Sequence, residues 1–354
     1  MNELAAAVFI ATVLLLLKSR VNYNRLPELT PRPAAASGEA GITVVIPARN
    51  EAAGIAGAVR SFPSGRVIVV DDASGDETAR LALEAGARVI PAPSLRRGEK
   101  GKAAACAAGA REARTEWVLF IDADTSYAPE FLGSLASYAR EHSLDMGSVL
   151  LEHRYSTFVE NLLSPYARAL YFTAVDSKRV NSFGSANAIA DGHCLLFRSQ
   201  AYEFIGGHRS LIKSPVEDVQ LALTAKRHRL RCHTVRSGSL GQVNLRGGWR
   251  NIWRRFGRSA PRFSLAHPWA QFQMVLSSLL MMSCLPIAVW SVANAQVLTG
   301  ILFLLLPVAL LVPWYRSRMA LFSLAAIYLL PLMALNSMAS LLFARRIPWK
   351  GRRV

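Results

Sequence analysis

The sequence predicts an α/β domain with a mostly parallel central sheet, joined to transmembrane and interfacial helices. Two observations predict the sheet: short runs of β-branched and aromatic residues alternate with helical segments, and carboxylates follow several of these runs directly. A third observation predicts the membrane helices, because hydrophobic residues make up 52% of the chain and its mean hydropathy is +0.23. An ordinary soluble domain is less apolar than this.

The charge balance predicts anionic partners. The 354 residues include 41 Lys and Arg against 24 Asp and Glu, a net charge of +17. Nucleic acid, anionic lipid headgroups and phosphorylated ligands would all suit such a chain. The long apolar segments favour the membrane surface, and we expect no nucleic-acid partner. Four cysteines are scattered without metal-site spacing and are expected to be small core residues in a reducing compartment: Cys106, Cys194, Cys232 and Cys284.

Residues 1–26 are predicted to form an N-terminal membrane anchor. An apolar run extends from Leu4 to Leu17, and basic residues come after it, which is the reverse of a secretory signal. We therefore expect its carboxyl side in the cytoplasm. The run is short for a span, so an interfacial helix is the alternative. Residues 27–41, rich in Pro, Ala, Ser and Gly, are predicted to be a linker.

Residues 42–235 are predicted to form the catalytic domain. Strands are expected at 42–47, 66–70, 88–90, 117–121 and 194–198, and helices at 54–61, 74–85, 99–114, 129–141, 201–205 and 214–228. Two capping boxes are predicted to start helices, one from Ser74 and Glu77 and one from Ser214 and Glu217. Pro215 suits the first position of the second of these helices.

Two carboxylates, Asp122 and Asp124, follow the strand 117–121. Alternation along a strand places them on the same side at its carboxyl end, the edge where open α/β sheets bind ligands. Two carboxylates there suit a hard divalent cation, Mg²⁺ or Mn²⁺, which would hold the oxygens of a diphosphate. An isolated Asp-x-Asp is better explained as a solvated turn, but the motifs around this one favour the metal.

The C-terminal third predicts a membrane region. Between 247 and 262, aromatic residues at helical spacing lie among arginines, so residues 236–268 are predicted to contain an amphipathic interfacial helix. A basic helix packed on the domain is the alternative. Residues 269–354 are predicted to be transmembrane helices and a basic tail, with apolar segments of spanning length at 272–290, 297–314 and 319–343.

The positive-inside rule gives one conflict in this region. Arg316 and Arg318 suit the cytoplasmic side, but three crossings then leave the basic C-terminal tail outside. We hypothesise that Pro331 and Asn336 break the last segment into a re-entrant turn, which would return the tail to the cytoplasm.

Four motifs in order carry a resemblance to a known family. The segments 44–51, 69–74, 101–102 and 122–124 resemble the motifs of family 2 glycosyltransferases, and the likeness continues through 192–198, 206–207 and 216–219. The chain most resembles the membrane-bound branch that includes carotenoid (diaponeurosporenoate-type) and hopanoid-associated glycosyltransferases, whose members share a tail like residues 349–352. The resemblance implies the GT-A fold, a nucleotide-diphosphate sugar as donor (a UDP-sugar above all) and inversion at the anomeric carbon.

The resemblance also implies roles for individual residues on the donor side. Asp72 would accept a hydrogen bond from the nucleobase, and the loop that contains Pro47, Arg49 and Glu51 would surround base and ribose. Lys102 would lie near the donor phosphates. Asp124 would bind the metal, with Asp122 near the ribose or the metal.

On the acceptor side, Asp218 resembles the catalytic base, which takes the proton of the acceptor hydroxyl. Glu217 is interpreted structurally, because a helix favours acidic residues in its first turn. His193 could reach the diphosphate or the metal, but a core histidine is an equal interpretation. The processive Gln-x-x-Arg-Trp motif is matched only loosely by residues 242–249, which favours transfer of a single sugar.

The sequence therefore predicts an inner-membrane enzyme whose catalytic domain faces the cytoplasm and which moves one sugar to an isoprenoid-type lipid. A polyprenyl-phosphate sugar transferase is one alternative; its acceptor is already ionised and would need no base. A catalytically silent membrane scaffold with the same fold is the other.

Overall fold

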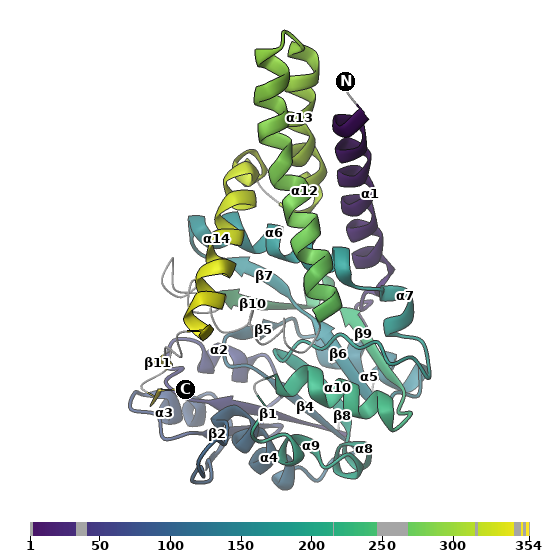
Figure 1. Ribbon diagram of the computed structural model, residues 1–354. Helices are drawn as coiled ribbons and strands as arrows, with labels where there is room; N and C mark the ends of the chain where they lie inside the picture. Colours follow the sequence, from purple (N-terminus) through teal and green to yellow (C-terminus); the bar gives the residue numbers. More distant parts are fainter. Residues whose placement is uncertain are drawn as a thin grey trace. The chain divides into compact units, whose positions relative to one another are not determined.

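The computed structural model describes residues 3–32, 41–214, 216–245, 268–315, 318–342, 348–349 and 352–353 (Figure 1). The chain divides into two units, of which one comprises Met1–Arg25, Tyr155–Ser177 and Arg246–Val354, and the other Leu26–Arg154 and Lys178–Leu245. The segment Tyr155–Ser177 thus interrupts the predicted catalytic range 42–235. The predicted amphipathic segment, residues 247–262, lies outside the described residues.

The unit formed by Leu26–Arg154 and Lys178–Leu245 is built on a seven-stranded sheet with the order β3-β2-β1-β4-β8-β6-β9. Its strands are β1 (Ile42–Ala48), β2 (Val67–Asp71), β3 (Arg88–Pro91), β4 (Trp117–Ile121), β6 (Met146–Leu150), β8 (Cys194–Arg198) and β9 (Cys232–Arg236). Four neighbouring pairs are parallel, and only β8 runs antiparallel to its neighbours β4 and β6. The predicted mostly parallel sheet is confirmed.

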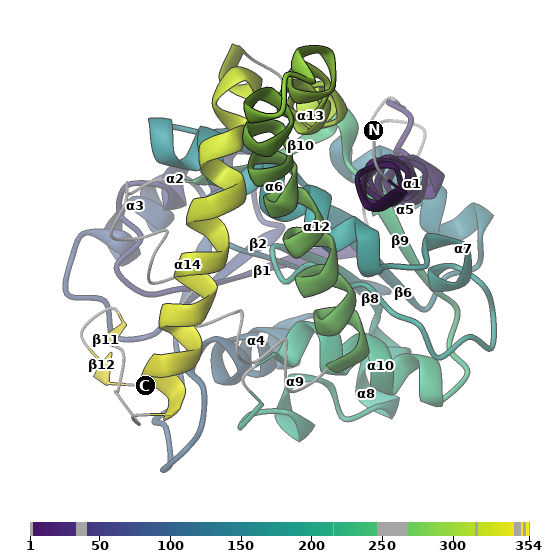
Figure 2. The same cartoon turned by 45° about the horizontal axis from the view of Figure 1, so that its top comes forward.

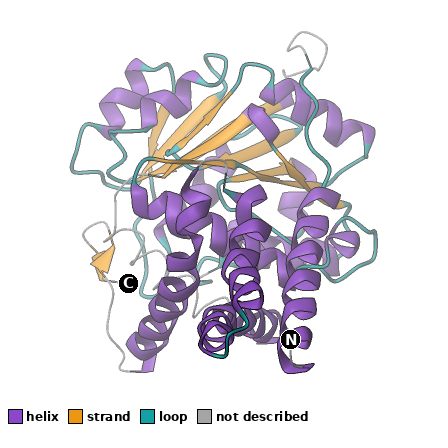
Figure 3. Ribbon diagram, turned by 90° about the horizontal axis from the view of Figure 1, so that it is seen from above, coloured by secondary structure: helices purple, strands orange, loops and turns teal. Residues whose placement is uncertain are grey.

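The sheet core explains why the central strands read as continuous apolar runs. Every residue of β4 is buried, as are the first four of β2 and of β8. Strands covered on both faces lose the alternation of polar and apolar residues. The alanine-rich helix α4 (Gly101–Glu112) packs on β1 and β2 and buries five alanine and cysteine side chains. Figure 3 shows the strands of this sheet side by side.

The other elements of this unit connect and cover the strands. Its further helices are α2 (Ile55–Arg60), α3 (Thr78–Glu84), α5 (Phe131–Glu141), α8 (Ser199–Phe204), α9 (Gly207–Ser210), α10 (Glu217–Arg227) and the 3-10 turn η3 (Gly238–Leu240), while α7 (Ser177–Val180) begins at the boundary. A smaller sheet has the order β5-β10-β7, formed by β5 (Thr125–Tyr127), β10 (Gly241–Leu245) and β7 (Glu152–Tyr155). The four cysteines are free and buried, as predicted.

Both predicted capping boxes are wrong. Helix α3 begins at Thr78, and the Ser74 hydroxyl instead donates to Asp71 and accepts the Asn50 N–H. Helix α10 begins at Glu217, and Ser214 accepts the Val216 N–H, which closes a turn before the helix. In both places the serine stabilises the loop at the end of a strand or before a helix, so the helix starts later than the pattern predicts. Pro215 lies outside the described residues.

The other unit is helical. It contains α1 (Glu3–Arg25), α6 (Phe158–Ala174), α12 (Pro268–Ala293), α13 (Val297–Leu311), α14 (Ser323–Leu342) and the 3-10 turns η4 (Val312–Trp314) and η5 (Arg318–Phe322); β11 (Pro348–Trp349) and β12 (Arg352–Arg353) pair antiparallel. Four segments of the described chain are long and apolar enough to cross a membrane: Glu3–Arg25, Trp269–Ala293, Val297–Trp314 and Arg318–Leu335. The N-terminal helix is thus longer than its apolar run and reaches spanning length.

Polar and aromatic contacts join these helices. Ser19 and Asn22 on α1, which Figure 2 shows nearly end-on, donate to the carbonyl oxygens of Ala169 and Phe172 at 2.6 and 3.0 Å. At the opposite end of α1, Phe9 packs edge-on against Phe303 of α13. Helices α12 and α13 form an antiparallel pair (Figure 1), joined by a three-residue turn.

The hypothesis of a re-entrant last segment is wrong. Helix α14 runs without interruption from Ser323 to Leu342 and includes Pro331 and Asn336. A proline inside a membrane helix is tolerated where neighbouring groups satisfy the freed carbonyl, so Pro331 does not have to end the helix. The side of the membrane on which the tail lies stays a prediction.

Candidate active site

Three neighbouring parallel strands bring the predicted donor-side residues to one edge. Strands β2, β1 and β4 lie side by side, so their carboxyl ends share an edge of the sheet. Asp72 follows β2, Pro47 lies near the end of β1, and Asp122 follows β4. The edge that the Asp-x-Asp pattern predicted is therefore the edge where these segments meet.

Two loops at this edge are bound to each other. Arg49 donates to the Asp72 carbonyl oxygen at 2.5 Å, and its guanidinium lies 3.7 Å from the buried Asp72 carboxylate. Asn50 accepts the Gly75 N–H at 2.8 Å, and Glu51 donates its N–H to Thr78 at 2.8 Å. The loop after β1 is thus held against the loop after β2 in one conformation, with Asp72 facing Arg49.

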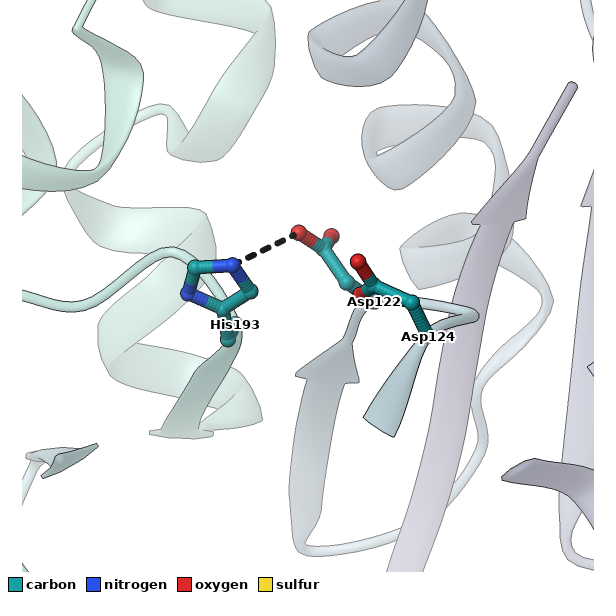
Figure 4. A group of neighbouring side chains, drawn as sticks. All are labelled: Asp122, Asp124 and His193. Carbon is teal, nitrogen blue, oxygen red and sulfur yellow. Dashed lines mark ion pairs between the residues drawn. The ribbon is translucent and has the colours of Figure 1, made fainter. Parts of the chain in front are cut away.

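A second group contains the two carboxylates after β4 and His193, which precedes β8 (Figure 4). One ligand atom from each of Asp122, Asp124 and His193 lies within 4.8 Å of the others. His193 Nε2 lies 4.0 Å from Asp122 Oδ2. Gly54 lets the start of α2 approach this turn, because a Cβ atom there would lie 2.7 Å from the Ala123 carbonyl oxygen.

A chain of contacts links Asp122 to Asp218 across the site. Lys102 Nζ lies 2.6 Å from Asp122 Oδ1 and donates to the Gly192 carbonyl oxygen at 2.9 Å. The Gly192 N–H donates to Asp218 Oδ2 at 3.0 Å. Lys102 comes from the first turn of α4, Gly192 from the segment before β8 and Asp218 from the first turn of α10. Three segments far apart in sequence therefore hold the two carboxylates in a fixed relation.

These residues line one narrow cavity. Its walls are formed by Pro47, Lys102, Cys106, Phe120, Ile121, Asp122, Gly192, Leu195, His208, Glu217 and Asp218. Charged groups of both signs thus converge on an otherwise apolar pocket.

Burial and the charge of Lys102 have opposite effects on the pKa values of Asp218 and Glu217. Burial raises the pKa of Asp218 above its ordinary value, and Lys102 opposes this. Burial likewise raises the pKa of Glu217, again against the effect of Lys102. For Lys102 itself, burial disfavours the charge, but Asp122 and Glu217 outweigh it and raise the pKa of the ammonium group. Two carboxylates with raised pKa beside a lasting positive charge are characteristic of sites of acid–base chemistry.

The His193 side of the site attracts cations. Burial opposes a charge on His193, but Asp191, Asp122 and Asp124 raise its pKa to about 9. His193 in turn keeps the pKa of Asp191 below its ordinary value, although burial acts the other way. In the absence of a metal ion, the carboxylates thus draw a proton to the imidazole.

The donor set fits a divalent cation. Two carboxylates and an imidazole within 4.8 Å offer two hard oxygen atoms and one nitrogen atom, and a cation there would replace the proton that the carboxylates attract. The predicted ligands Asp122 and Asp124 are thus brought together, and Mg²⁺ and Mn²⁺ both have oxygen ligands available.

The structure joins most of the predicted site residues, in two groups. Pro47, Lys102, Asp122 and Asp218 line the cavity, whereas Arg49, Glu51 and Asp72 hold the neighbouring loops. Asp191 and Gly192 were not among the predicted site residues. Glu217 lies in the first turn of α10, as predicted, and it also lines the cavity. The available signal was the run Asp191-Gly192-His193 directly before a strand.

The order of the strands and the position of the Asp-x-Asp turn indicate the fold class of this unit. A mixed sheet of this order, with an Asp-x-Asp turn at the carboxyl edge of β4, is the GT-A fold of nucleotide-sugar transferases. A solved structure supports the fold: the mannosyltransferase PcManGT from Pyrobaculum calidifontis, in complex with GDP-Man and Mn²⁺, matches with a TM-score of 0.53 over 96% of this chain and 97% of that one, at 18% identity.

The sequence comparison points to the family that the motifs resemble. Residues 43–206, just under half of the chain, match the model of Glycosyl transferase family 2. Over 214 residues the chain is 30% identical to the 4,4'-diaponeurosporenoate glycosyltransferase of Staphylococcus aureus strain USA300, covering 56% of this chain and 54% of the relative. The protein of the same name from strain bovine RF122 is 31% identical over 195 residues, 51% of this chain and 50% of that one. The chain spans about half the length of the curated relatives it matches. The resemblance to the carotenoid branch is confirmed.

Proposed function

We propose that the protein transfers a single sugar from a nucleotide-diphosphate donor to an isoprenoid-type lipid, with inversion, at the cytoplasmic face of the inner membrane. The observation that carries the proposal is the contact chain from Asp122 through Lys102 and Gly192 to Asp218 within one cavity. The name of the Staphylococcus aureus relatives, which specifies a carotenoid acid, supports a lipid acceptor. The four segments of membrane-spanning length support the location.

The donor is proposed to be a UDP-sugar, bound along the edge formed by β2, β1 and β4. Asp72 would accept a hydrogen bond from the base, and its carboxylate is oriented by Arg49. Pro47, Arg49 and Glu51 would surround base and ribose, in a loop whose backbone the neighbouring loop already holds. Such a preformed loop loses little entropy when the nucleotide binds.

The diphosphate is proposed to lie between Lys102 and the carboxylates. Asp122 and Asp124 would hold Mg²⁺ or Mn²⁺, and the Mn²⁺ bound to PcManGT, a protein of the same fold, supports a metal in this place. When bound, the ion would neutralise the negative charge that develops on the departing diphosphate. Lys102 would add a second positive charge, and its ion pair with Asp122 keeps that charge at the phosphate end of the cavity.

Asp218 is proposed as the catalytic base. An inverting transfer breaks the bond between the anomeric carbon and the diphosphate while the acceptor oxygen attacks the opposite face, and the hydroxyl proton passes to a carboxylate. The Gly192 N–H and the Val219 N–H fix both oxygens of Asp218, at 3.0 and 2.8 Å. Burial makes this carboxylate more basic than an exposed one, which favours proton transfer from an alcohol.

The test compares membrane lipids from cells that carry the gene, lack it, or carry Asp218→Asn or Glu217→Gln. Mass spectrometry should detect a glycosylated isoprenoid lipid only with the wild type and, at a reduced level, with Glu217→Gln. Asp218→Asn should lower transfer by about 10²–10⁴-fold. Unchanged glycosylation by Asp218→Asn would exclude the base and favour a phosphate acceptor. No new lipid together with no metal-dependent UDP binding would favour the scaffold.

A further inference from the structure

We propose that His193 is a third metal ligand, that Asp191 positions it, and that together they make the site prefer Mn²⁺ to Mg²⁺. The inference rests on the proposed function, because it deepens the assignment of the metal site at Asp122 and Asp124. It adds one ligand, one positioning residue and a metal preference.

The position of His193 fits a shared ion. Its Nε2 lies 4.0 Å from Asp122 Oδ2, and one ligand atom from each of Asp122, Asp124 and His193 lies within 4.8 Å of the others. Metal bonds to imidazole nitrogen and carboxylate oxygen are about 2.0–2.2 Å long, so two ligands of one ion lie at most about 4.4 Å apart. Figure 4 shows the imidazole and the two carboxylates directed toward a common point. Only a small movement of Asp124 or His193 is needed.

Asp191 fixes both the direction and the tautomer of the imidazole. Its Oδ1 lies 2.5 Å from His193 Nδ1 and also accepts the His193 backbone N–H at 3.1 Å. Asp191 is held in turn, because its own N–H donates to Ser148 Oγ at 2.9 Å. A histidine that donates from Nδ1 to a carboxylate presents the lone pair of Nε2, which is the arrangement common to metal-binding histidines. Here that lone pair is directed toward Asp122.

Asp122 offers only one oxygen to the ion. Lys102 lies 2.6 Å from Oδ1, and Oδ2 is the oxygen nearest to His193. The protein would therefore supply Asp122 Oδ2, a carboxylate oxygen of Asp124 and His193 Nε2.

A nitrogen ligand changes the choice of metal. Mg²⁺ demands near-ideal octahedral oxygen coordination and gives up its water reluctantly. Imidazole is a ligand of transition metals, and Mn²⁺ is the transition metal that also suits carboxylate ligands. A site of two oxygens and one positioned nitrogen therefore favours Mn²⁺ over Mg²⁺, and removal of the nitrogen should lower the preference without destroying the site.

The experiment measures metal binding by the purified full-length protein in detergent, in the presence of UDP. The electron paramagnetic resonance signal of free Mn²⁺ decreases as the protein binds the ion, and a titration gives the dissociation constant of Mn²⁺. Displacement of bound Mn²⁺ by added Mg²⁺ gives the dissociation constant of Mg²⁺. His193→Asn and Asp191→Asn should each weaken Mn²⁺ binding by about 10–100-fold, and Mg²⁺ binding much less. Asp191→Glu should restore part of the Mn²⁺ affinity. His228→Asn, at an exposed histidine of the same unit, is the matched control and should change neither constant.

Two results would overturn the inference. An unchanged ratio of Mn²⁺ to Mg²⁺ affinity in His193→Asn would exclude the imidazole as ligand, and an unchanged ratio in Asp191→Asn alone would exclude the positioning role. Asp124→Asn separates this from the proposed function: it should weaken both metals, and normal binding of both by Asp124→Asn would remove the proposed site itself. A wild-type pulsed spectrum without coupling of bound Mn²⁺ to an imidazole nitrogen would also overturn the inference, and this measurement needs no variant.

Discussion

Lys102 and Asp218 bind the same residue from two directions: Lys102 Nζ donates to the Gly192 carbonyl oxygen at 2.9 Å, and Asp218 Oδ2 accepts the Gly192 N–H at 3.0 Å. The peptide segment at Gly192 thus sets the separation between the Lys102 ammonium group, proposed to contact the diphosphate, and the Asp218 carboxylate, proposed as the base. A change at this segment should alter the geometry of both partners together.

Gly192→Ala tests this arrangement. A Cβ atom at Gly192 would lie 3.0 Å from Asp218 Oδ2 and 3.3 Å from Lys102 Nζ, so both side chains must shift by a few tenths of an ångström. Because small misplacements in an active site are costly, we expect kcat to fall by about 10-fold or more while the protein stays folded. Steady-state kinetics and the thermal midpoint check this.

Gly57→Ala is the matched control, since nothing lies within 4 Å of a Cβ atom at Gly57 in helix α2. It should leave kcat unchanged and stabilise the protein by about 0.5–1 kcal/mol. Equal kinetics for Gly192→Ala and the wild type would show that the Gly192 segment does not set the geometry of the reaction.

The pH dependence of transfer should report Asp218. A base acts only when deprotonated, and burial raises the pKa of Asp218, opposed by Lys102. Activity should therefore be full above this raised pKa and fall as the pH drops through it, at a pH above the ordinary value for aspartate, about 3.9. The profile of kcat/KM against pH at saturating metal measures this limb. A profile that stays flat down to pH 4 would contradict the assignment.

Lys102→Met should move that acid limb and weaken donor binding. The Lys102 ammonium group lowers the pKa of Asp218, whereas burial raises it. Without the ammonium group this pKa rises further, and the acid limb shifts to higher pH. The partly exposed Asp122 carboxylate also loses its partner at 2.6 Å, which should cost about 1 kcal/mol of stability. We expect KM for the donor to increase. Lys178→Met, at an exposed lysine, is the control, and an unshifted limb in Lys102→Met would contradict the coupling of the two groups.

His208 should make the unit that contains the sheet sensitive to acid. It is 1% exposed, and its Nδ1 lies 2.8 Å from the Tyr202 hydroxyl. Burial, with a smaller effect of Lys102, lowers its pKa to about 3. The unfolded state binds a proton near pH 6.5, so the stabilisation is full above that pH and is lost as the pH falls toward 3, by at most about 1.4 kcal/mol per pH unit.

Thermal unfolding between pH 7 and pH 4 checks this, with His208→Gln as the comparison. The variant should be less stable at pH 7 but should lose less stability on acidification than the wild type. Parallel curves for the two proteins would show that His208 does not control the acid sensitivity.

The sequence predicts where Asp72 and Asp122 lie because each of them directly follows a buried apolar strand. The runs before Asp72 and Asp122 are short and continuous, and parallel pairing then places their ends together whatever the loops do. His193, which we propose as a metal ligand, is different, because its position depends on Asp191 and on the antiparallel pairing of β4 with β8. No periodicity in the sequence specifies that pairing.

Missed elements have physical causes as well. Strands β6 and β9 include Ser148, His233 and Thr234, so they lack the apolar run of a buried strand. Helix α6 contains Pro165, which is typical of a break, although Thr157 and Glu160 form a true capping box at its start. The two predicted capping boxes failed because serines near strand ends and turns have loop N–H groups to accept from, and short-range patterns do not distinguish these partners.

The contacts of α1 have a practical consequence for handling the protein. Asn22 donates to the carbonyl oxygens of Phe172 and Val175, and Ser19 to that of Ala169, where α6 ends. Helix α1 is therefore an integral part of its bundle and not a detachable tether. Trimming residues 1–25 to obtain a water-soluble enzyme would remove these donors and expose the apolar side of α6. The shortened chain should therefore aggregate, and detergent or nanodiscs with the whole chain are the better route to crystals and assays.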